Sequence, residues 1–461
     1  MHDGIIDAVI VAPYPAPVLS PLLPPTPRRS FFWPILTALL VVCMMLALGG
    51  ATAAVLTLRG NSVPTDAVTN WVDMRPQARD TALRALLDRL EGAVKAKDRA
   101  AFMAEVDQSD PALVKREQLL YDNLTKIPFA EFQYELGPWR SDLQRFLSAQ
   151  VRQKYHQTAH VGTVTIRYRI AGIDSKAVTT PWLPIFVYRD GRWEIGGQAS
   201  DKNAPYGANG QAWDAAGPIV VQRSKRVVAV LSADDAARGS YLLDLAEQGL
   251  DRLARTRPNG WDGKVFVTAV QDTRIFDTYF ADSPERVARV AAIAVPYYTE
   301  VPDWANFAPD YAATRIVFNP QELSAQPDEL AHDLTHEFTH AAMGPITGGA
   351  TPRWLVEGFA EYAAFNGADV PKSFIQRDLG GLDVSKGLPS DDEFYSESRN
   401  YVGGWLACRY IATQYGQDKL IALYAAFMHE PNQDVAVQQV LGIDFSALES
   451  AWEHYVKGLE G

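Results

Sequence analysis

An uncharged, apolar run from Phe31 to Leu56 is the feature that most constrains how this chain can fold. About 20 apolar residues in a helix cross the hydrocarbon core of a bilayer, so this run is long enough to span one. Residues 31–58 are therefore predicted to form a single transmembrane helix. Arg28 and Arg29 immediately precede the run, and basic residues tend to remain inside. This places the N-terminus in the cytoplasm and the body of the chain on the extracytoplasmic side of the cell membrane.

A cleaved signal peptide is the alternative, because Ala51-Thr52-Ala53 offers the small residues of a cleavage site. The apolar run is longer than a typical signal core and follows a long leader, which favours the anchor. Both interpretations export the rest of the chain. The leader, residues 1–30, is rich in proline and is predicted to be an extended cytoplasmic segment outside any packed core.

Charge and cysteine content exclude several classes of function. The formal net charge is -12, and the acidic excess lies beyond the apolar run. An acidic body argues against a nucleic-acid partner and against adhesion to anionic lipid. Cys43 and Cys408 are far apart in the sequence, so a disulfide between them is implausible and no cysteine cluster can bind a metal. The exported part must be stabilised by its core alone.

Residues 76–200 are predicted to form a small α+β domain with helices first and strands after them. Apolar residues recur at helical spacing in 81–106, and apolar and polar residues alternate in 160–173. Asp190-Gly191 between two further apolar runs predicts a β-hairpin. This order resembles the nuclear-transport-factor-2-like superfamily. The resemblance implies a helix-plus-curved-sheet domain, and such domains often enclose a pocket.

The middle domain shows no catalytic constellation. His156 and His160 lie where a helix gives way to a strand, and we interpret both as surface histidines. Asn123-Leu124-Thr125 is a glycosylation sequon, which matters only where the host glycosylates exported proteins. Linkers are predicted at 59–75 and at 201–217, and the second is polar and glycine-rich.

The segment His336-Glu337-Phe338-Thr339-His340 carries the chemistry of the last region. Asp328 near its start is a candidate helix cap. Two histidines four residues apart lie on one face of a helix, one turn apart, where they can bind one metal ion. Glu337 lies next to the first histidine, near the open coordination position, which suits a general base. The motif alone is short enough to arise by chance.

Glu357 makes the site specific. It follows His340 by 17 residues, counting 357 minus 340. A catalytic zinc site needs a third protein ligand and one position open for water. Glu361 lies one helical turn beyond Glu357 and is expected to accept the second ring N–H of a ligand histidine, His336.

With HEFTH followed by WLVEGFAEY, the chain resembles the gluzincin metallopeptidases of the peptidase MA clan, in the thermolysin-like and M1-aminopeptidase-like branch. The resemblance covers residues 218–461 and implies a zincin domain with a mixed sheet and helices. It also implies that Zn2+ is the cofactor. Its protein ligands would be His336, His340 and Glu357, with Glu337 as the catalytic base.

The same resemblance implies roles for residues around the zinc site, and one sequence element of the family is missing from this chain. Tyr401, within NYVGGWLACRYIATQYG, matches the helix that supplies an oxyanion-stabilising tyrosine, although a tyrosine on an amphipathic helix also fits a core position. His332 has no counterpart, and we interpret it as a surface or ligand-supporting histidine. No Gly-x-Met-Glu-Asn element precedes the histidines. In M1 aminopeptidases that element grips the free amine, so aminopeptidase activity is not supported.

These features predict a membrane-anchored, extracytoplasmic zinc metallopeptidase that hydrolyses peptide bonds of a peptide or protein substrate. One alternative is a catalytically silent zincin-like binding or scaffold protein with a structural zinc. A second alternative places the function in the middle domain, as a ligand pocket or regulator with the peptidase as its effector.

Overall fold

The structure is a computed structural model, and it describes the main part of the chain beyond the apolar run. The described residues are 74–199, 210–258, 260–280, 290–301, 310–319, 322, 326–365, 376, 379 and 382–460. The predicted leader and transmembrane helix, residues 1–58, lie outside them. No helix among the described residues is long and apolar enough to cross a membrane.

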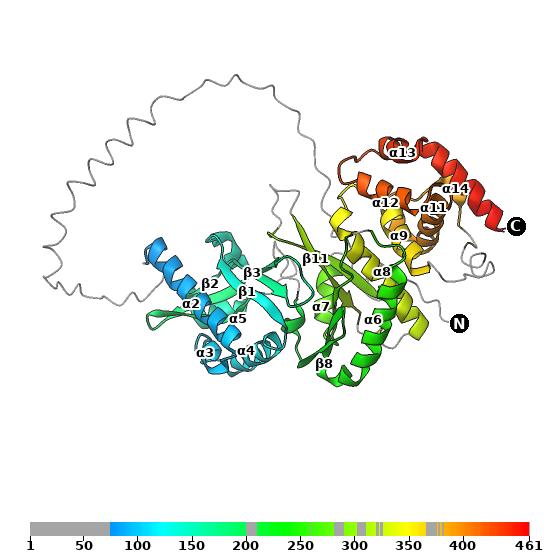
Figure 1. The fold of residues 1–461 in the computed structure, drawn as a ribbon. Helices are drawn as coiled ribbons and strands as arrows, with labels where there is room; N and C mark the ends of the chain where they lie inside the picture. Colours follow the sequence, from blue (N-terminus) through cyan, green and yellow to red (C-terminus); the bar gives the residue numbers. More distant parts are fainter. Residues whose placement is uncertain are drawn as a thin grey trace, which may run out of the picture. The chain divides into compact units, whose positions relative to one another are not determined.

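The N-terminal region, residues 74–199, begins with three helices, α2 (Pro76–Ala96), α3 (Arg99–Met103) and α4 (Pro111–Leu124) (Figure 1). Apolar residues at helical spacing bury one face of α2, among them Leu83, Leu86, Leu87 and Leu90. A short helix, α5 (Ala149–Tyr155), follows later. Three helices precede the first strand, as predicted, while α5 lies between the first and second strands and was not predicted.

Two antiparallel sheets complete this region. One has the order β1 (Phe129–Leu136), β3 (Val164–Ile170) and β4 (Val178–Trp182), and the other β2 (Ala159–Val161), β5 (Pro184–Arg189) and β6 (Arg192–Gln198). The predicted hairpin at Asp190-Gly191 is confirmed, and both residues have positive φ, 52° and 81°, as a two-residue hairpin turn requires. The α+β class is confirmed, while membership of the nuclear-transport-factor-2-like superfamily stays a prediction.

A five-stranded mixed sheet opens the C-terminal region, residues 210–460. Its order is β10 (Ala292–Tyr298), β11 (Tyr311–Phe318), β9 (Val265–Ala269), β8 (Val227–Ser232) and β7 (Ile219–Arg223). The central pairs β8–β9 and β9–β11 are parallel, and both outer pairs are antiparallel. Helix α6 (Gly239–Leu253) connects β8 to β9, as parallel neighbours require.

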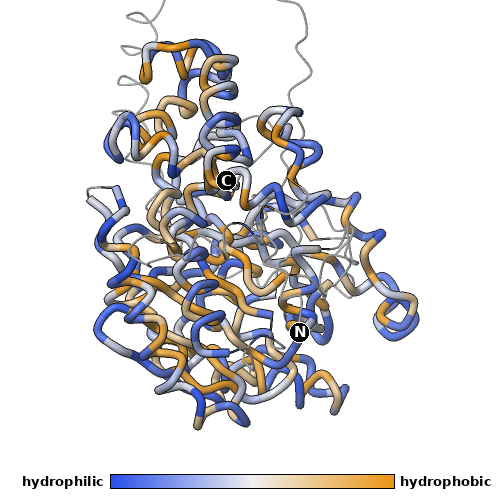
Figure 2. Tube along the Cα trace, turned by 90° about the vertical axis from the view of Figure 1, so that its right-hand side faces the viewer, coloured by the Kyte–Doolittle hydropathy of each residue, from blue (hydrophilic) through white to orange (hydrophobic). Residues whose placement is uncertain are grey.

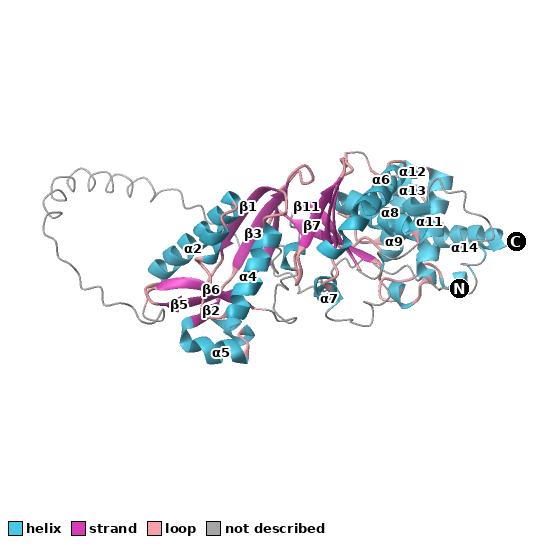
Figure 3. Cartoon of the chain, turned by 90° about the horizontal axis from the view of Figure 1, so that it is seen from below, coloured by secondary structure: helices cyan, strands magenta, loops and turns pink. Residues whose placement is uncertain are grey.

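Helices then follow the sheet to the end of the chain (Figures 1 and 3). They are α8 (Pro327–Met343), α9 (Arg353–Phe365), α11 (Arg399–Tyr415), α12 (Gln417–Ala426), α13 (Gln433–Leu441) and α14 (Phe445–Glu460), with α7 (Thr273–Asp277) earlier. Short 3₁₀ turns are η2 (Ser141–Phe146), η3 (His156–Thr158), η4 (Ala212–Asp214), η5 (Ala233–Arg238), η6 (Thr278–Phe280), η9 (Gly344–Ile346), η10 (Val384–Lys386) and η11 (Phe394–Ser396). Figure 2 shows hydrophobic and hydrophilic residues alternating along the helical segments, as expected for helices that bury one face.

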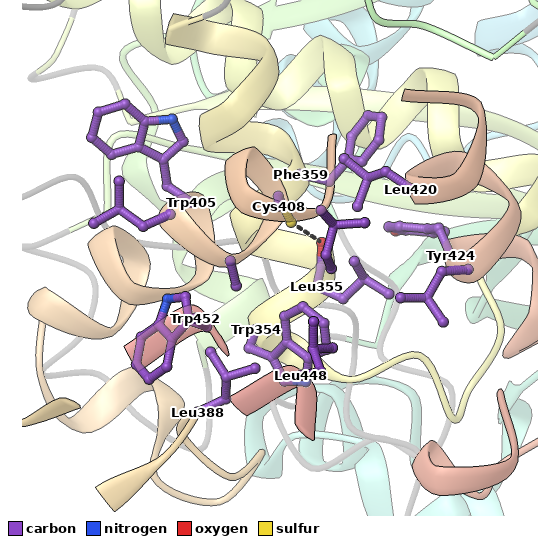
Figure 4. Close-up of a cluster of buried hydrophobic side chains, with 14 of the residues drawn as sticks. Trp354, Leu355, Phe359, Leu388, Trp405, Cys408, Leu420, Tyr424, Leu448 and Trp452 are labelled. Carbon is purple, nitrogen blue, oxygen red and sulfur yellow. Dashed lines mark hydrogen bonds between the residues drawn. The ribbon is translucent and has the colours of Figure 1, made fainter. Parts of the chain in front are cut away.

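Two hydrophobic cores hold the C-terminal region together. One lies between the sheet and helices α6 and α8, and Val265, Val267 and Ala269 of β9 belong to it. The other joins α9, α11, α12 and α14 around Trp354 and Trp452 (Figure 4). Cys408 is a buried, free cysteine in this second core.

The opposite face of the sheet packs against the N-terminal region. Phe266 and Thr268 of β9 point to this side and line a small cavity together with Tyr168 and Trp213. Arg315 of β11 forms two 2.7 Å hydrogen bonds with Asp174, which lies in the turn after β3. The described residues of the N-terminal and C-terminal regions belong to one compact unit. The sheet is therefore covered on both faces, which matches its run of buried apolar strands.

Three local expectations differ from the structure. His160 is not a surface histidine, because it is 1% exposed and stacks on the ring of Trp139; His156 is exposed as predicted. Asn123 of the sequon is fully buried, and its amide donates to the carbonyl of Gly217 at 3.0 Å, so the folded protein does not present it. Helix α8 is capped by Gln326 in a capping box, and Asp328 lies inside its first turn.

Candidate active site

Helix α8 carries the predicted histidines through the interior of the C-terminal region. Leu330, Leu334 and Phe338 recur at spacings of four and pack into the core beneath the sheet. His336 and His340 lie on a different face, because two residues along a helix turn the side chain about 200° around its axis. Both histidines are buried, with side chains 2% and 8% exposed. The periodicity of α8 therefore separates a core face from a histidine face.

His336, His340 and Glu357 bring three donor atoms together. Each offers one ligand atom, and these atoms lie within 4.8 Å of one another. The Oε2 atom of Glu357 is 3.3 Å from His336 Nε2 and 3.7 Å from His340 Nε2. Glu357 is fully buried on α9. Among the described residues this is the cluster that could hold a metal ion.

The donor set fits zinc. Nitrogen and oxygen donors about 2.0–2.1 Å from one tetrahedral ion lie roughly 3.4 Å apart, close to the two distances from Glu357 Oε2. Across the described part of the chain, His336 Nε2, His340 Nε2 and Glu357 Oε2 are buried and make no hydrogen bond. Buried polar atoms normally have a partner, so three unsatisfied atoms at one point need an explanation. A bound cation would satisfy all three.

Glu361, one turn beyond Glu357 on α9, orients the first histidine as expected. Its Oε1 lies 2.8 Å from His336 Nδ1, and its Oε2 lies 3.1 Å from His332 Nε2. In a neutral ring the bond to Glu361 places the proton of His336 on Nδ1 and leaves the lone pair on Nε2. His332 thus supports the carboxylate that supports His336.

Burial and neighbouring charges shift the two histidines of the pocket in opposite directions, and burial together with the charge of His336 holds the pKa of His340 well below its ordinary value. Burial opposes a charge on His336, but its contacts with Glu357 and Glu361 raise its pKa well above the ordinary value. Burial raises the pKa of Glu337 to about 8, with the charge of His336 opposing part of the shift. Glu337 Oε2 also makes no hydrogen bond within the described chain. Glu337 is therefore a buried carboxyl group beside the donor cluster with one oxygen unsatisfied by the described chain.

A close crossing of α9 and α11 places Tyr401 beside the cluster. A Cβ atom on Gly358 would lie 2.3 Å from the carbonyl carbon of Gly404, so the two backbones touch where both residues are glycine. Tyr401 lies one turn before Gly404, is 4% exposed, and its ring centroid is 6.4 Å from that of His336. The structure therefore brings the predicted tyrosine to the pocket.

Tyr395 is a site residue that the sequence did not reveal. It lies on the turn η11 before α11, and its hydroxyl donates a hydrogen bond of 2.8 Å to Glu357 Oε1. No motif singles it out, because the contact joins a short turn to a helix 38 residues earlier. The sequence offered one signal, which is that Tyr395 lies six residues before Tyr401. Spacing alone does not predict where a side chain on an irregular turn points.

The chain was also compared with known proteins. Residues 296–458 match the family model of the Peptidase MA superfamily, and no curated protein matches the chain. One similar solved structure is a point mutant of a two-domain M1 zinc metallopeptidase bound to L-arginine, with 14% identity, 61% of this chain and 60% of that chain covered, and a TM-score of 0.31. Another is an M1 zinc metallopeptidase from Deinococcus radiodurans, with 14% identity, 66% and 62% covered, and a TM-score of 0.29.

The family match includes every candidate residue of the site, from His336 to Tyr401, and supports a zincin-type peptidase domain in this part of the chain. The chain spans about three fifths of the length of the two solved structures it resembles. The matched segment begins in β10, so it leaves out the N-terminal region and the first strands of the five-stranded sheet.

Proposed function

We propose that the C-terminal region is a zinc-dependent metallopeptidase that hydrolyses peptide bonds in a peptide or protein substrate. His336, His340 and Glu357 would hold the zinc ion. The observation that carries the proposal is the buried cluster of three donor atoms without hydrogen bonds, at spacings that suit one tetrahedral ion.

The surrounding residues supply the remaining chemistry. Zinc, when bound, would lower the pKa of a water molecule towards neutrality and polarise the scissile carbonyl. Glu337 accepts the proton of the attacking water on its carboxylate and delivers it to the leaving amine. Tyr401 donates a hydrogen bond to the oxyanion that develops on the substrate. Glu361 keeps His336 in the tautomer and orientation that binding requires.

The rival function is a zincin-like scaffold with a structural zinc and no turnover. Structural zinc sites have four protein ligands, whereas the described residues offer three at this cluster. Glu337 is also retained beside them, buried and without a hydrogen bond in the described chain. Both features favour a catalytic site over a structural one.

We also propose that residues 31–58 anchor this domain on the extracytoplasmic face of the cell membrane. The support is the length of the uncharged apolar run and the arginines that precede it. Protease accessibility of intact cells or spheroplasts tests this: digestion of the C-terminal region from outside supports the orientation. Protection of the C-terminal region until the membrane is opened would show the opposite orientation.

Cleavage profiling of the full-length protein in detergent against a proteome-derived peptide library tests the function. Peptides should be cleaved by the wild type and should remain intact with a zinc chelator or with Glu337→Gln. Cleavage that persists unchanged in chelator would exclude the zinc mechanism. A zinc-loaded wild type that cleaves no peptide would favour the scaffold.

A further inference from the structure

The two carboxylate oxygens of Glu357 have different partners. Oε2 faces His336 and His340 at 3.3 and 3.7 Å, while Oε1 accepts the 2.8 Å hydrogen bond from Tyr395. The side chain of Glu357 is fully buried, so its contacts come from protein groups. Tyr395 therefore engages the oxygen of Glu357 that is turned away from the two histidines.

The turn that carries Tyr395 is itself fixed between two helices. The guanidinium carbon of Arg353 lies 4.7 Å from the centre of the Tyr395 ring. The backbone N–H of Arg353, at the start of α9, donates to Asp391 Oδ1 at 2.8 Å, and its Nη1 donates to the Asp391 carbonyl at 2.9 Å. Asn400, in the first turn of α11, donates to the carbonyl of Phe394 at 2.9 Å. The segment that carries Tyr395 is thus held by residues of both α9 and α11.

We infer that Tyr395 is a positioning residue for the metal ligand Glu357. Its hydrogen bond fixes the rotation of the carboxylate and engages Oε1, which would leave Oε2 to bind the metal. Binding through one oxygen preserves the open coordination position that a catalytic site needs. The inference rests on the proposed function, because it assigns Tyr395 a role towards the same zinc ion.

This role differs from that of Tyr401, although the tyrosine rings lie 6.3 Å apart. A hydroxyl that stabilises an oxyanion acts only while substrate reacts, so its removal leaves the affinity for zinc unchanged. A hydroxyl that orients a ligand acts in the resting protein, so its removal weakens zinc binding. The two tyrosines can therefore be distinguished without any substrate.

The experiment is competition for zinc between the full-length protein and a chromophoric chelator. Tyr395→Phe is expected to raise the zinc dissociation constant about 10- to 100-fold, and Tyr401→Phe to leave it unchanged. Tyr362→Phe is the matched control, because Tyr362 lies on the same helix as Glu357 and bonds Gln417 at 3.3 Å, away from the cluster. At saturating zinc, Tyr395→Phe should regain most of its turnover, whereas Tyr401→Phe should not.

A zinc dissociation constant of Tyr395→Phe within about twofold of wild type would overturn the inference. A wild type that binds no zinc would instead overturn the proposed function, so the two failures are distinct. The melting temperature of each metal-free variant reports whether it folds. If Tyr395→Phe does not fold, Asn400→Ala takes its place, because it loosens the turn and leaves Tyr395 intact. Weaker zinc binding by that variant supports the inference, and unchanged binding overturns it.

Discussion

His336 Nδ1 and Glu361 Oε1 lie 2.8 Å apart across the interface between α8 and α9. This contact joins the helix that carries two proposed ligands to the helix that carries the third. The orientation of His336 is therefore set by a residue that would not touch the metal. The preorganisation of the site depends on this supporting contact as well as on the ligands.

Removing this support should weaken metal binding. Glu361→Ala leaves the Nδ1–H of His336 without its acceptor inside the protein, so the ring loses its fixed tautomer. We expect zinc affinity to fall about 10- to 100-fold, measured by chelator competition. Asp328→Ala is a suitable control, because Asp328 is an exposed carboxylate in the first turn of α8 and takes no part in its capping box. Equal zinc affinity in Glu361→Ala and wild type would contradict the role of Glu361.

Loss of the proposed base should separate metal binding from turnover. Glu337→Gln keeps the size of the side chain and removes its ability to accept a proton. Zinc content should remain that of the wild type while kcat falls by at least about 100-fold. Metal analysis and peptide hydrolysis on the same sample check both halves. Peptide hydrolysis at the wild-type rate would exclude Glu337 as the base.

The buried pair between Asp174 and Arg315 should couple the N-terminal region to the sheet of the C-terminal region. Their side chains are 1% and 4% exposed. Asp174→Ala leaves Arg315 buried without its counter-charge, which is expected to destabilise the protein by about 3–5 kcal/mol. The double variant Asp174→Ala with Arg315→Met should recover part of this loss, because it removes the unpaired charge. Denaturant midpoints of the wild type, the single variant and the double variant test this expected ranking of stability. A double variant that is less stable than Asp174→Ala would contradict it.

The N-terminal region should become less stable in acid through Asp107. Burial opposes its charge, but hydrogen bonds from Tyr155, Ser109 and Arg189 hold the pKa of Asp107 well below its usual value. A lowered pKa stabilises the fold above the unfolded-state pKa of about 3.9, and this contribution is lost as the pH falls below about 4. Asp107→Asn should therefore lower the melting temperature at pH 7, and the difference from wild type should shrink below pH 4.

Asp190→Asn provides the control for this pH series. Asp190 lies beside Arg189 on the same hairpin, but its side chain is 91% exposed. The melting temperature of Asp190→Asn should follow that of the wild type at every pH. A difference between Asp107→Asn and wild type that stayed constant down to pH 2 would contradict the assignment to Asp107 ionisation.

Local periodicity predicted the part of the site that lies on helices. Spacings of four within α8 and within α9 fix which side chains share a face, so the positions of His336, His340, Glu357 and Glu361 could be anticipated. Tyr395 could not, because its place depends on a turn held by contacts with two distant helices. His160 was assigned to the surface wrongly for a similar reason: its burial depends on Trp139, and sequence spacing does not report such a contact.

The backbone contact between Gly358 and Gly404 offers a way to sort related chains. A chain that kept both histidines and Glu357 but carried a larger residue at either glycine would have to separate its two helices. That separation would move Tyr395 and Tyr401 away from the proposed metal ligands. These two glycines could therefore distinguish working peptidases from relatives that have kept only the metal ligands.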